Sequence, residues 1–162
     1  MMAIDMGGPI NKASYVTGTA LLTAAGTAGS DVMAAVMIGG MVPPLAIAIS
    51  ATINKNIWPK AQRSGALVNY VMGLAFITEG AIPFAASNPL RVIPPLFLSS
   101  GVAGALSMTF GAVSKAPHGG IFAIAVGAVS NPIMYLLALV LGSVLGAILL
   151  IVSLNLGKKV EK

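Results

Sequence analysis

One long charge-free segment of this chain restricts its fold strongly. It extends from Val32 to Asn54 and consists mostly of apolar residues, glycine and proline. A helix needs about 20 such residues to cross the hydrocarbon core of a bilayer, and this segment reaches that length. We predict a membrane span here. We do not expect a continuous straight helix, because Gly39-Gly40 and Pro43-Pro44 interrupt the segment and proline lacks the amide proton that an inner helical turn requires.

The composition of the whole chain agrees with a membrane protein. Of its 162 residues, 57% are hydrophobic and 8% are charged, whereas a soluble domain usually devotes about a quarter of its residues to charge. The net charge of +5 comes from cations at loop and chain ends without interleaved aromatic residues. This pattern is typical of a membrane orientation signal and argues against a nucleic-acid partner. We therefore predict an all-α integral membrane protein with several transmembrane helices, broken or re-entrant segments, and the lipid bilayer as its surroundings.

Further apolar segments extend this prediction. Ala13–Ser30 has a borderline length for a span, and Gly65–Thr78 is too short to cross comfortably before the chain reaches Glu79. Val92–Ser114 is a credible span despite two prolines, and Ile133–Leu154 is the last one. Half-length segments that glycine and proline break are typical of re-entrant helices near a transport site.

Two basic segments set the expected orientation. Lys55–Arg63 and the tail after Gly157 carry cations, which favours a cytoplasmic location for both. An even number of crossings must then separate them. Either the segment that ends at Glu79 turns back or Ile121–Val129 completes a crossing, and we prefer the first. The predicted organisation is a membrane domain over residues 1–157 and a basic cytoplasmic tail over residues 158–162.

Several kinds of site are disfavoured. The chain has no cysteine, which excludes disulfides, thiolate metal sites and a cysteine nucleophile. One histidine and no paired carboxylates leave too few ligands for a metal, and no dinucleotide or phosphate-loop fingerprint is present. We predict no metal and no cofactor. The N-terminus, Met1–Lys12, lacks the basic and apolar regions of a signal peptide, and we expect it to be an internal part of something longer.

Glu79 is the sharpest candidate for chemistry, because a charged side chain at the centre of a membrane helix costs about 2.5–3.5 kcal/mol on insertion scales. Gly80 and Pro83 break the helix around it. One interpretation is an ion pair with Arg91 that only fastens two helix ends. The other is a polar cavity in which the carboxylate accepts hydrogen bonds from ligand hydroxyls or acts as a general base. The residues alone do not separate a polyhydroxyl ligand from a transported cation or proton.

Three more polar residues are candidates. His118 lies in Ala116–Gly120, where proline and two glycines prevent a regular helix, and it either caps a helix end or exchanges hydrogen bonds or protons with a ligand. Arg91 either binds phosphate or neutralises Glu79, and we prefer the second. Asn88 is expected as the N-cap of a helix whose first residue is the proline after it.

Five stretches of the chain resemble the membrane IIC component of the bacterial fructose-specific phosphoenolpyruvate-dependent phosphotransferase system. They occur in the order of the family and at roughly its spacing: Asp5–Lys12, Met41–Pro44, Phe76–Phe84, Asn88–Pro94 and Ala116–Gly120. The resemblance extends from Asp5 to about Leu154 and covers the C-terminal half of such a component. It implies a permease for fructose or a related hexose, and so favours sugar over protons as the ligand.

The resemblance also implies roles for single residues. In related IIC proteins a glutamate at the tip of a re-entrant hairpin and a histidine contact sugar hydroxyls, and these correspond to Glu79 and His118. Glu79 would in addition assist deprotonation of the attacking hydroxyl. Thr78, Asn88 and Arg91 are expected as secondary wall groups. Asn88 departs from the aspartate that we expect in the family, which removes a charge near Arg91.

The resemblance implies partners as well. A IIB domain would phosphorylate the sugar from its phosphocysteine, so that phosphotransferase activity exists only together with IIA and IIB, and the N-terminal half of IIC would complete the permease in the bacterial inner membrane. The sequence leaves open whether the chain forms a homodimer. Two alternatives remain at this point: a small ion- or proton-coupled transporter or pore, and a truncated remnant that inserts into the membrane but transports nothing.

Overall fold

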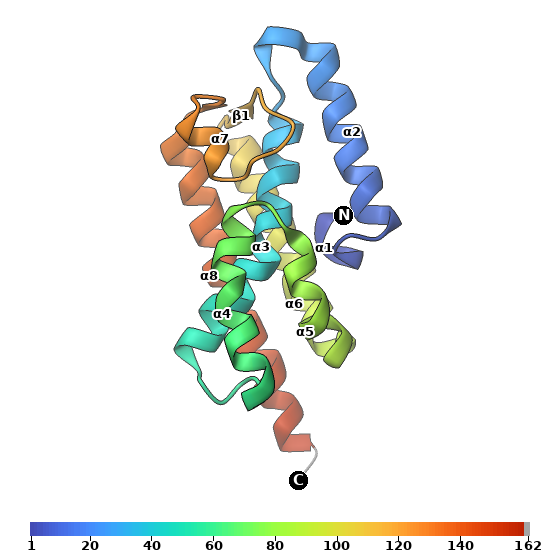
Figure 1. Cartoon of the computed structure of the whole chain (residues 1–162), viewed down its shortest axis with the longest axis vertical. Helices are drawn as coiled ribbons and strands as arrows, with labels where there is room; N and C mark the ends of the chain where they lie inside the picture. The colour runs from blue at the N-terminus through green and yellow to red at the C-terminus, as the bar shows by residue number, and fades with distance from the viewer. Residues whose placement is uncertain (161–162) are drawn as a thin grey trace.

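A computed structural model describes residues 1–160 of the chain, with side chains through residue 156. Residues 161–162 of the predicted basic tail lie outside the described residues. The structure is helical apart from two short strands (Figure 1). Its elements are α1 (Met2–Asp5), α2 (Pro9–Ala25), the 3-10 helix η1 (Gly26–Ala28), α3 (Asp31–Ile53), α4 (Lys60–Leu74), the 3-10 helix η2 (Thr78–Ala81), α5 (Ile82–Ser87), α6 (Pro89–Thr109), β1 (Val113–Ser114), α7 (Phe122–Ala125), β2 (Val129–Ser130) and α8 (Pro132–Val160).

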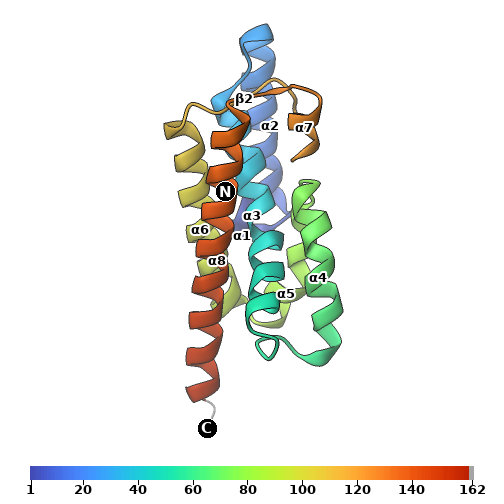
Figure 2. The same cartoon turned by 90° about the vertical axis from the view of Figure 1, so that its left-hand side faces the viewer.

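Three long helices, α3, α6 and α8, pack side by side and form the body of the molecule (Figure 2). Each is long and apolar enough to cross a membrane. In α3, 83% of the apolar window is buried, against 39% in α6 and in α8, so α3 is the enclosed central helix. The outward faces of α6 and α8 keep large apolar side chains exposed, as lipid-facing helices do. The all-α membrane fold predicted from the sequence is confirmed.

The structure corrects the expectation that α3 is interrupted, because one continuous helix includes Pro43 and Pro44. Pro44 has no amide proton to donate to the carbonyl of Gly40, four residues earlier. The Thr78 hydroxyl, from another part of the chain, donates to that carbonyl over 2.9 Å. A helix interrupted in this way persists in a membrane when a neighbouring side chain satisfies the freed backbone group.

The same arrangement occurs in α6, which also contains a proline pair, Pro94 and Pro95. Pro95 cannot donate to the carbonyl of Arg91, and the Ser153 hydroxyl of α8 donates to it over 2.9 Å. In return, Arg91 Nη1 donates to the Ser153 carbonyl over 3.2 Å. The second proline of each pair is thus matched by a hydroxyl from a neighbouring element.

Between α3 and α6 the chain forms a hairpin that does not cross the bundle (Figure 1). Helix α4 rises to about mid-height, the chain turns through η2, and α5 runs back toward the end from which α4 started. This hairpin confirms the preferred prediction that the segment ending at Glu79 turns back, and Glu79 lies in the turn. The alternative crossing by Ile121–Val129 is wrong, because that segment forms α7, a turn and part of β2 at the opposite end of the bundle.

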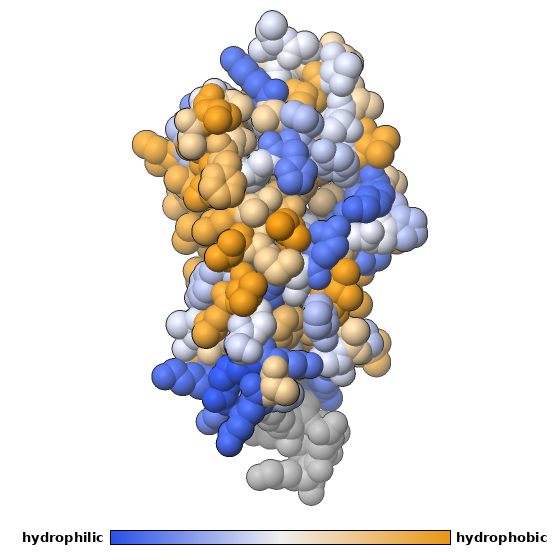
Figure 3. All heavy atoms as spheres, viewed as in Figure 1, coloured by the Kyte–Doolittle hydropathy of each residue, from blue (hydrophilic) through white to orange (hydrophobic). Residues whose placement is uncertain are grey.

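The hairpin also makes the predicted topology consistent. Because it returns, only α6 and α8 cross between the loop before α4 and the end of α8, and both of these lie at the same end of the bundle (Figure 1). Lys55, Lys60 and Arg63 belong to that end, and the lower end of the surface is strongly hydrophilic there, in contrast to the apolar areas above it (Figure 3).

Some predicted boundaries need correction. The borderline segment Ala13–Ser30 contains most of α2, a 17-residue helix that is not one of the three candidate spans. The span predicted over Val92–Ser114 ends as a helix at Thr109, and Ser114 belongs to β1. Asn88 occupies the N-cap of α6 as predicted, although its side chain makes no capping hydrogen bond.

We predict that Thr78→Val weakens the fold. Valine keeps the shape of threonine and removes the hydroxyl that bonds to the Gly40 carbonyl. The free energy of unfolding should fall by about 1 kcal/mol, the order measured for interhelical hydrogen bonds in membranes. Unfolding in mixed detergent micelles, followed by circular dichroism, measures the change. Thr109→Val is the matched control, since the exposed Thr109 hydroxyl bonds to Ala105 within its own helix. Equal losses in both variants would contradict the role of Thr78.

Candidate functional site

A polar cavity lies where the hairpin turn meets the N-terminal segment and the loop before α7. Its volume is about 160 Å³. The predicted residues Thr78, Glu79 and His118 all line it. The remaining lining residues are Met2, Asn11, Lys12, Tyr15 and Phe76. The fold therefore brings the two principal predicted site residues together, although they are far apart in the sequence.

The Glu79 carboxylate is held by the N-terminal segment. Its Oε1 atom lies 3.3 Å from Lys12 Nζ, and the two side chains are 46% and 62% exposed, respectively. The aliphatic part of Glu79 lies against Gly7, where a Cβ atom would come within 2.9 Å of Glu79 Cγ. Gly7 also has a φ of +124°, which other residues rarely adopt. The carboxylate is therefore paired with a cation and still accessible from outside the protein.

The predicted pair between Glu79 and Arg91 is wrong. The Arg91 guanidinium is directed to α8, where it donates to the Ser153 carbonyl, and Glu79 is paired with Lys12 instead. Neither Arg91 nor Asn88 lines the cavity. The sequence suggested Arg91 as the partner of Glu79 because Arg91 is the cation nearest to it along the chain. In the fold, Arg91 lies in the first turn of α6, after the returning arm of the hairpin.

Asp5 fixes the start of α2 and so the position of Lys12. Its carboxylate accepts hydrogen bonds from the backbone N–H groups of Ile10, at 2.7 Å, and Asn11, at 2.8 Å. These amides belong to the first turn of α2, which has no partners of its own for them. The Asn11 side chain donates to the Met2 carbonyl over 2.7 Å. The turn between α1 and α2 is thus closed by side chains on both sides.

Sequence reasoning assigned no chemistry to this turn and missed Asn11, Lys12 and Tyr15. A local signal was available: Gly8 precedes a proline at the first helical position, so the new helix needed a capping acceptor from elsewhere, and Asp5 is the nearest acid. No local signal indicates that Lys12 meets Glu79, because that contact depends on the packing of distant segments.

His118 belongs to an aromatic group on the cavity wall. Its ring centroid lies 5.1 Å from that of Phe76 and 6.3 Å from that of Tyr15. The His118 loop is attached to the hairpin by the Ile121 amide, which donates to the Leu74 carbonyl over 2.9 Å. Aromatic faces next to charged and amide groups form a surface that suits a ligand with both C–H and O–H groups.

The Thr78 hydroxyl has a structural role in the cavity wall. The side chain is 3% exposed, and its proton is used in the bond to the Gly40 carbonyl. Thr78 therefore joins the cavity wall to α3, whereas Glu79 and His118 present exposed groups.

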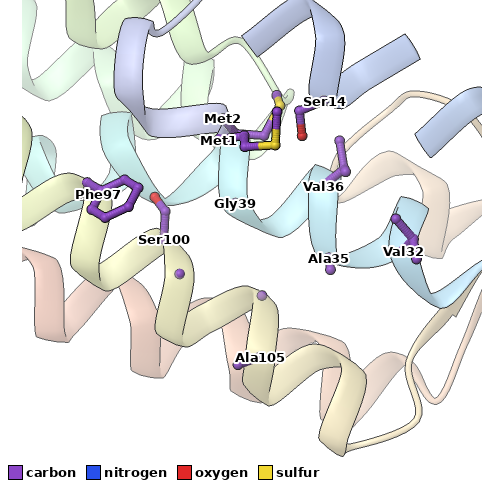
Figure 4. A pocket seen from close by; sticks show the side chains of 12 residues that line it. Met1, Met2, Ser14, Val32, Ala35, Val36, Gly39, Phe97, Ser100 and Ala105 are labelled. Atoms are coloured by element: carbon purple, nitrogen blue, oxygen red, sulfur yellow. The ribbon is translucent and has the colours of Figure 1, made fainter. Parts of the chain in front are cut away.

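A second hollow, of about 220 Å³, lies between α1, α2, α3 and α6 (Figure 4). Ser14 and Ser100 supply its polar side chains, and none of its lining side chains is charged. The others are Met1, Met2, Val32, Ala35, Val36, Gly39, Phe97, Gly101, Gly104 and Ala105. A polar ligand is better matched by the cavity at Glu79. Among the described residues, no group of three or more metal-ligating side chains was found.

Comparison with known proteins finds relatives that are named as fructose-specific components of the phosphotransferase system. It is 51% identical over 154 residues to the PTS system fructose-specific EIIB'BC component of Xanthomonas campestris, and this alignment covers 93% of this chain and 26% of that protein. It is 47% identical over 150 residues to the fructose permease IIC component of Bacillus amyloliquefaciens, covering 93% and 47%. It is 46% identical over 149 residues to the PTS system fructose-specific EIIC component of Haloferax volcanii, covering 92% and 38%.

The chain thus spans from about a quarter to just under half of the length of these curated relatives. No protein-family model matches the chain, and no solved structure matches it significantly. The sequence relationship confirms the resemblance inferred from the five stretches.

We predict that Asp5→Ala loosens the N-terminal wall of the cavity. The substitution removes both acceptors of the first turn of α2, and loss of a capping side chain lowers the free energy of unfolding by about 1 kcal/mol. Amide hydrogen exchange should accelerate at Ile10 and Asn11. Exchange in the middle of α8 is the internal control and should not change. Unaltered exchange at both amides would contradict the capping role of Asp5.

Proposed function

We propose that this chain, which is homologous to part of the fructose-specific components of the phosphotransferase system, forms one wall of a sugar site in a membrane permease. One observation carries the proposal: Glu79 and His118 line a single cavity at the turn of a re-entrant hairpin. The names of the relatives supply the substrate class, a hexose such as fructose. Uptake would be coupled to phosphorylation of the sugar.

The residues of the cavity suit a sugar. An ionised carboxylate offers about four acceptor positions, so Glu79 can accept hydrogen bonds from two hydroxyls while it contacts Lys12. His118 adds a ring nitrogen that donates or accepts. The rings of Tyr15 and Phe76 offer apolar surface to the C–H face of the sugar. Such a wall binds a neutral, hydroxyl-rich ligand more readily than it binds a bare cation, because the Lys12 ammonium neutralises the carboxylate.

In the proposed reaction Glu79 acts as general base. As the sugar hydroxyl attacks the phosphorus of a phosphocysteine, its proton passes to the Glu79 carboxylate, the new O–P bond forms, and the cysteine thiolate leaves. This chain contains no cysteine, so the phosphocysteine belongs to a separate IIB unit. The relative from Xanthomonas campestris is named as a component that combines B and C parts, which supports a IIB partner.

The proposed site is incomplete in this chain. A cavity of about 160 Å³ is smaller than the roughly 300–1,000 Å³ of typical ligand pockets, and its two charged side chains are about half exposed. The chain matches only 47% of a relative that is named as IIC alone. We assign the missing wall to the other half of a IIC unit, the N-terminal half in our interpretation. The basic end with Lys55 and the chain end would face the cytoplasm of a bacterial cell.

We predict that Glu79→Gln abolishes coupled uptake. The test replaces the matching segment of the Bacillus amyloliquefaciens fructose permease IIC component with this chain, in cells that lack their own fructose permeases. Loss of a general base lowers turnover by 10²- to 10⁴-fold, so uptake of radiolabelled fructose should fall by at least about 100-fold. His118→Gln should be milder, at about tenfold for one hydrogen-bonding group. Asn88→Ala, outside the cavity, should leave uptake unchanged.

Other outcomes would contradict the proposal in distinct ways. Unchanged uptake in the Glu79→Gln permease would remove Glu79 from the site. Uptake that requires a membrane potential and no phosphate donor would indicate an ion-coupled transporter. A chimera that reaches the membrane and transports nothing would identify this chain as a non-transporting remnant.

A further inference from the structure

The role of Lys12 is not explained by the cavity chemistry alone. Its ammonium lies 3.3 Å from the Glu79 carboxylate, and the two residues are 67 positions apart in the chain. We propose that Lys12 is a positioning residue of the sugar site: it holds the Glu79 carboxylate toward the cavity and joins it in binding one diol of the sugar. This inference rests on the proposed function of the cavity.

The position of Lys12 is determined by its backbone. Its amide donates to the Gly8 carbonyl over 3.0 Å, in the helical turn that Asp5 and Asn11 close. The side chain extends from this fixed turn to the hairpin. On its other side Glu79 packs against Gly7, where a Cβ atom would come within 2.9 Å of Glu79 Cγ. The contact therefore joins two elements that are each held independently of the pair.

The charges of the described residues leave Lys12 as the partner of Glu79. Among the side chains of the described residues, the one ion pair is that between Lys12 and Glu79. Arg91 is engaged with Ser153, and Lys60 and Arg63 lie at the start of α4, at the far end of the hairpin arm. A carboxylate at membrane depth requires a partner. Without Lys12, Glu79 would lose its opposite charge and its defined orientation.

The pair has the right complement of atoms for a diol. One Glu79 oxygen contacts the ammonium, which leaves the other oxygen free to accept from a sugar hydroxyl. An ammonium has three N–H donors, so Lys12 can hold Glu79 and still donate to a sugar oxygen. Because each hydroxyl both donates and accepts, two adjacent hydroxyls can bridge the carboxylate and the ammonium. A neutral polyol satisfies both charges without separating them.

Because the site is incomplete in this chain alone, the test measures binding of radiolabelled fructose to the chimeric Bacillus amyloliquefaciens permease that carries this chain, in lipid nanodiscs. Lys12→Met should weaken binding by roughly 10- to 100-fold, as expected for a hydrogen bond to a charged group, and Lys12→Arg should restore most of the loss. In a Glu79→Gln background, Lys12→Met should cost clearly less than it does in the unmodified chimera, because part of the effect of Lys12 passes through Glu79. Lys60 is an exposed lysine at the start of α4, away from the cavity. Lys60→Met is the matched control and should bind as the unmodified chimera does.

A second measurement guards against misfolded variants. A water-soluble carbodiimide joins a carboxylate to an amine in contact, with loss of water, and mass spectrometry should detect an amide between Lys12 and Glu79 in the unmodified chain. Bound fructose covers the carboxylate that the carbodiimide must activate, so fructose should suppress this cross-link in the chimera, and sucrose at the same concentration should not.

The outcomes separate the two proposals. If the unmodified chimera binds no fructose, the sugar site itself fails and the role of Lys12 fails with it. If fructose binds and Lys12→Met binds equally well, or the losses in Lys12→Met and Glu79→Gln are additive, the role of Lys12 alone is overturned. A cross-link that fructose leaves unchanged would also overturn it.

Discussion

The rest of the structure depends on one requirement: a backbone carbonyl inside a membrane bundle needs a hydrogen-bond donor. Each proline of a pair frees the carbonyl four residues before it, and a hydroxyl from another element donates to the carbonyl that the second proline frees. Thr78 serves Gly40, and Ser153 serves Arg91. The prolines therefore do not break α3 and α6. They create two places at which a neighbouring element must be attached.

The first of these places determines where the site is formed. The hairpin turn lies against α3 at Gly40, where a Cβ atom would come within 2.5 Å of Phe76 Cε2 and 2.8 Å of Thr78 Oγ1. The missing side chain admits the turn, and the freed carbonyl binds it. Glu79 follows Thr78 directly, so the bond that attaches the hairpin also sets the depth of the carboxylate. Lys12 and His118 reach it from two other segments that are fixed by their own hydrogen bonds.

The sequence predicted what local signals encode. A charged residue beside glycine and proline in an apolar stretch indicated Glu79 at a helix break, and the parity of crossings indicated that its segment turns back. The continuity of α3 could not be predicted, because it depends on a hydroxyl that is 38 positions away from Gly40. The partner of Glu79 was missed for a related reason. Arg91 was the nearby cation, whereas Lys12 is brought to Glu79 only by the packing of the N-terminal turn on the hairpin.

These contacts differ in strength in a way that suits a binding site. Separating the hairpin from α3 would leave the buried Gly40 carbonyl without its donor, which costs about 1–3 kcal/mol. The ion pair between Lys12 and Glu79 is about half exposed, and such pairs contribute about 0–1 kcal/mol. The stronger connection therefore lies behind the cavity and the weaker one lies on its open side. A ligand that bridges Lys12 and Glu79 can therefore adjust the geometry of the pair at little cost, while the turn that carries the carboxylate stays in place.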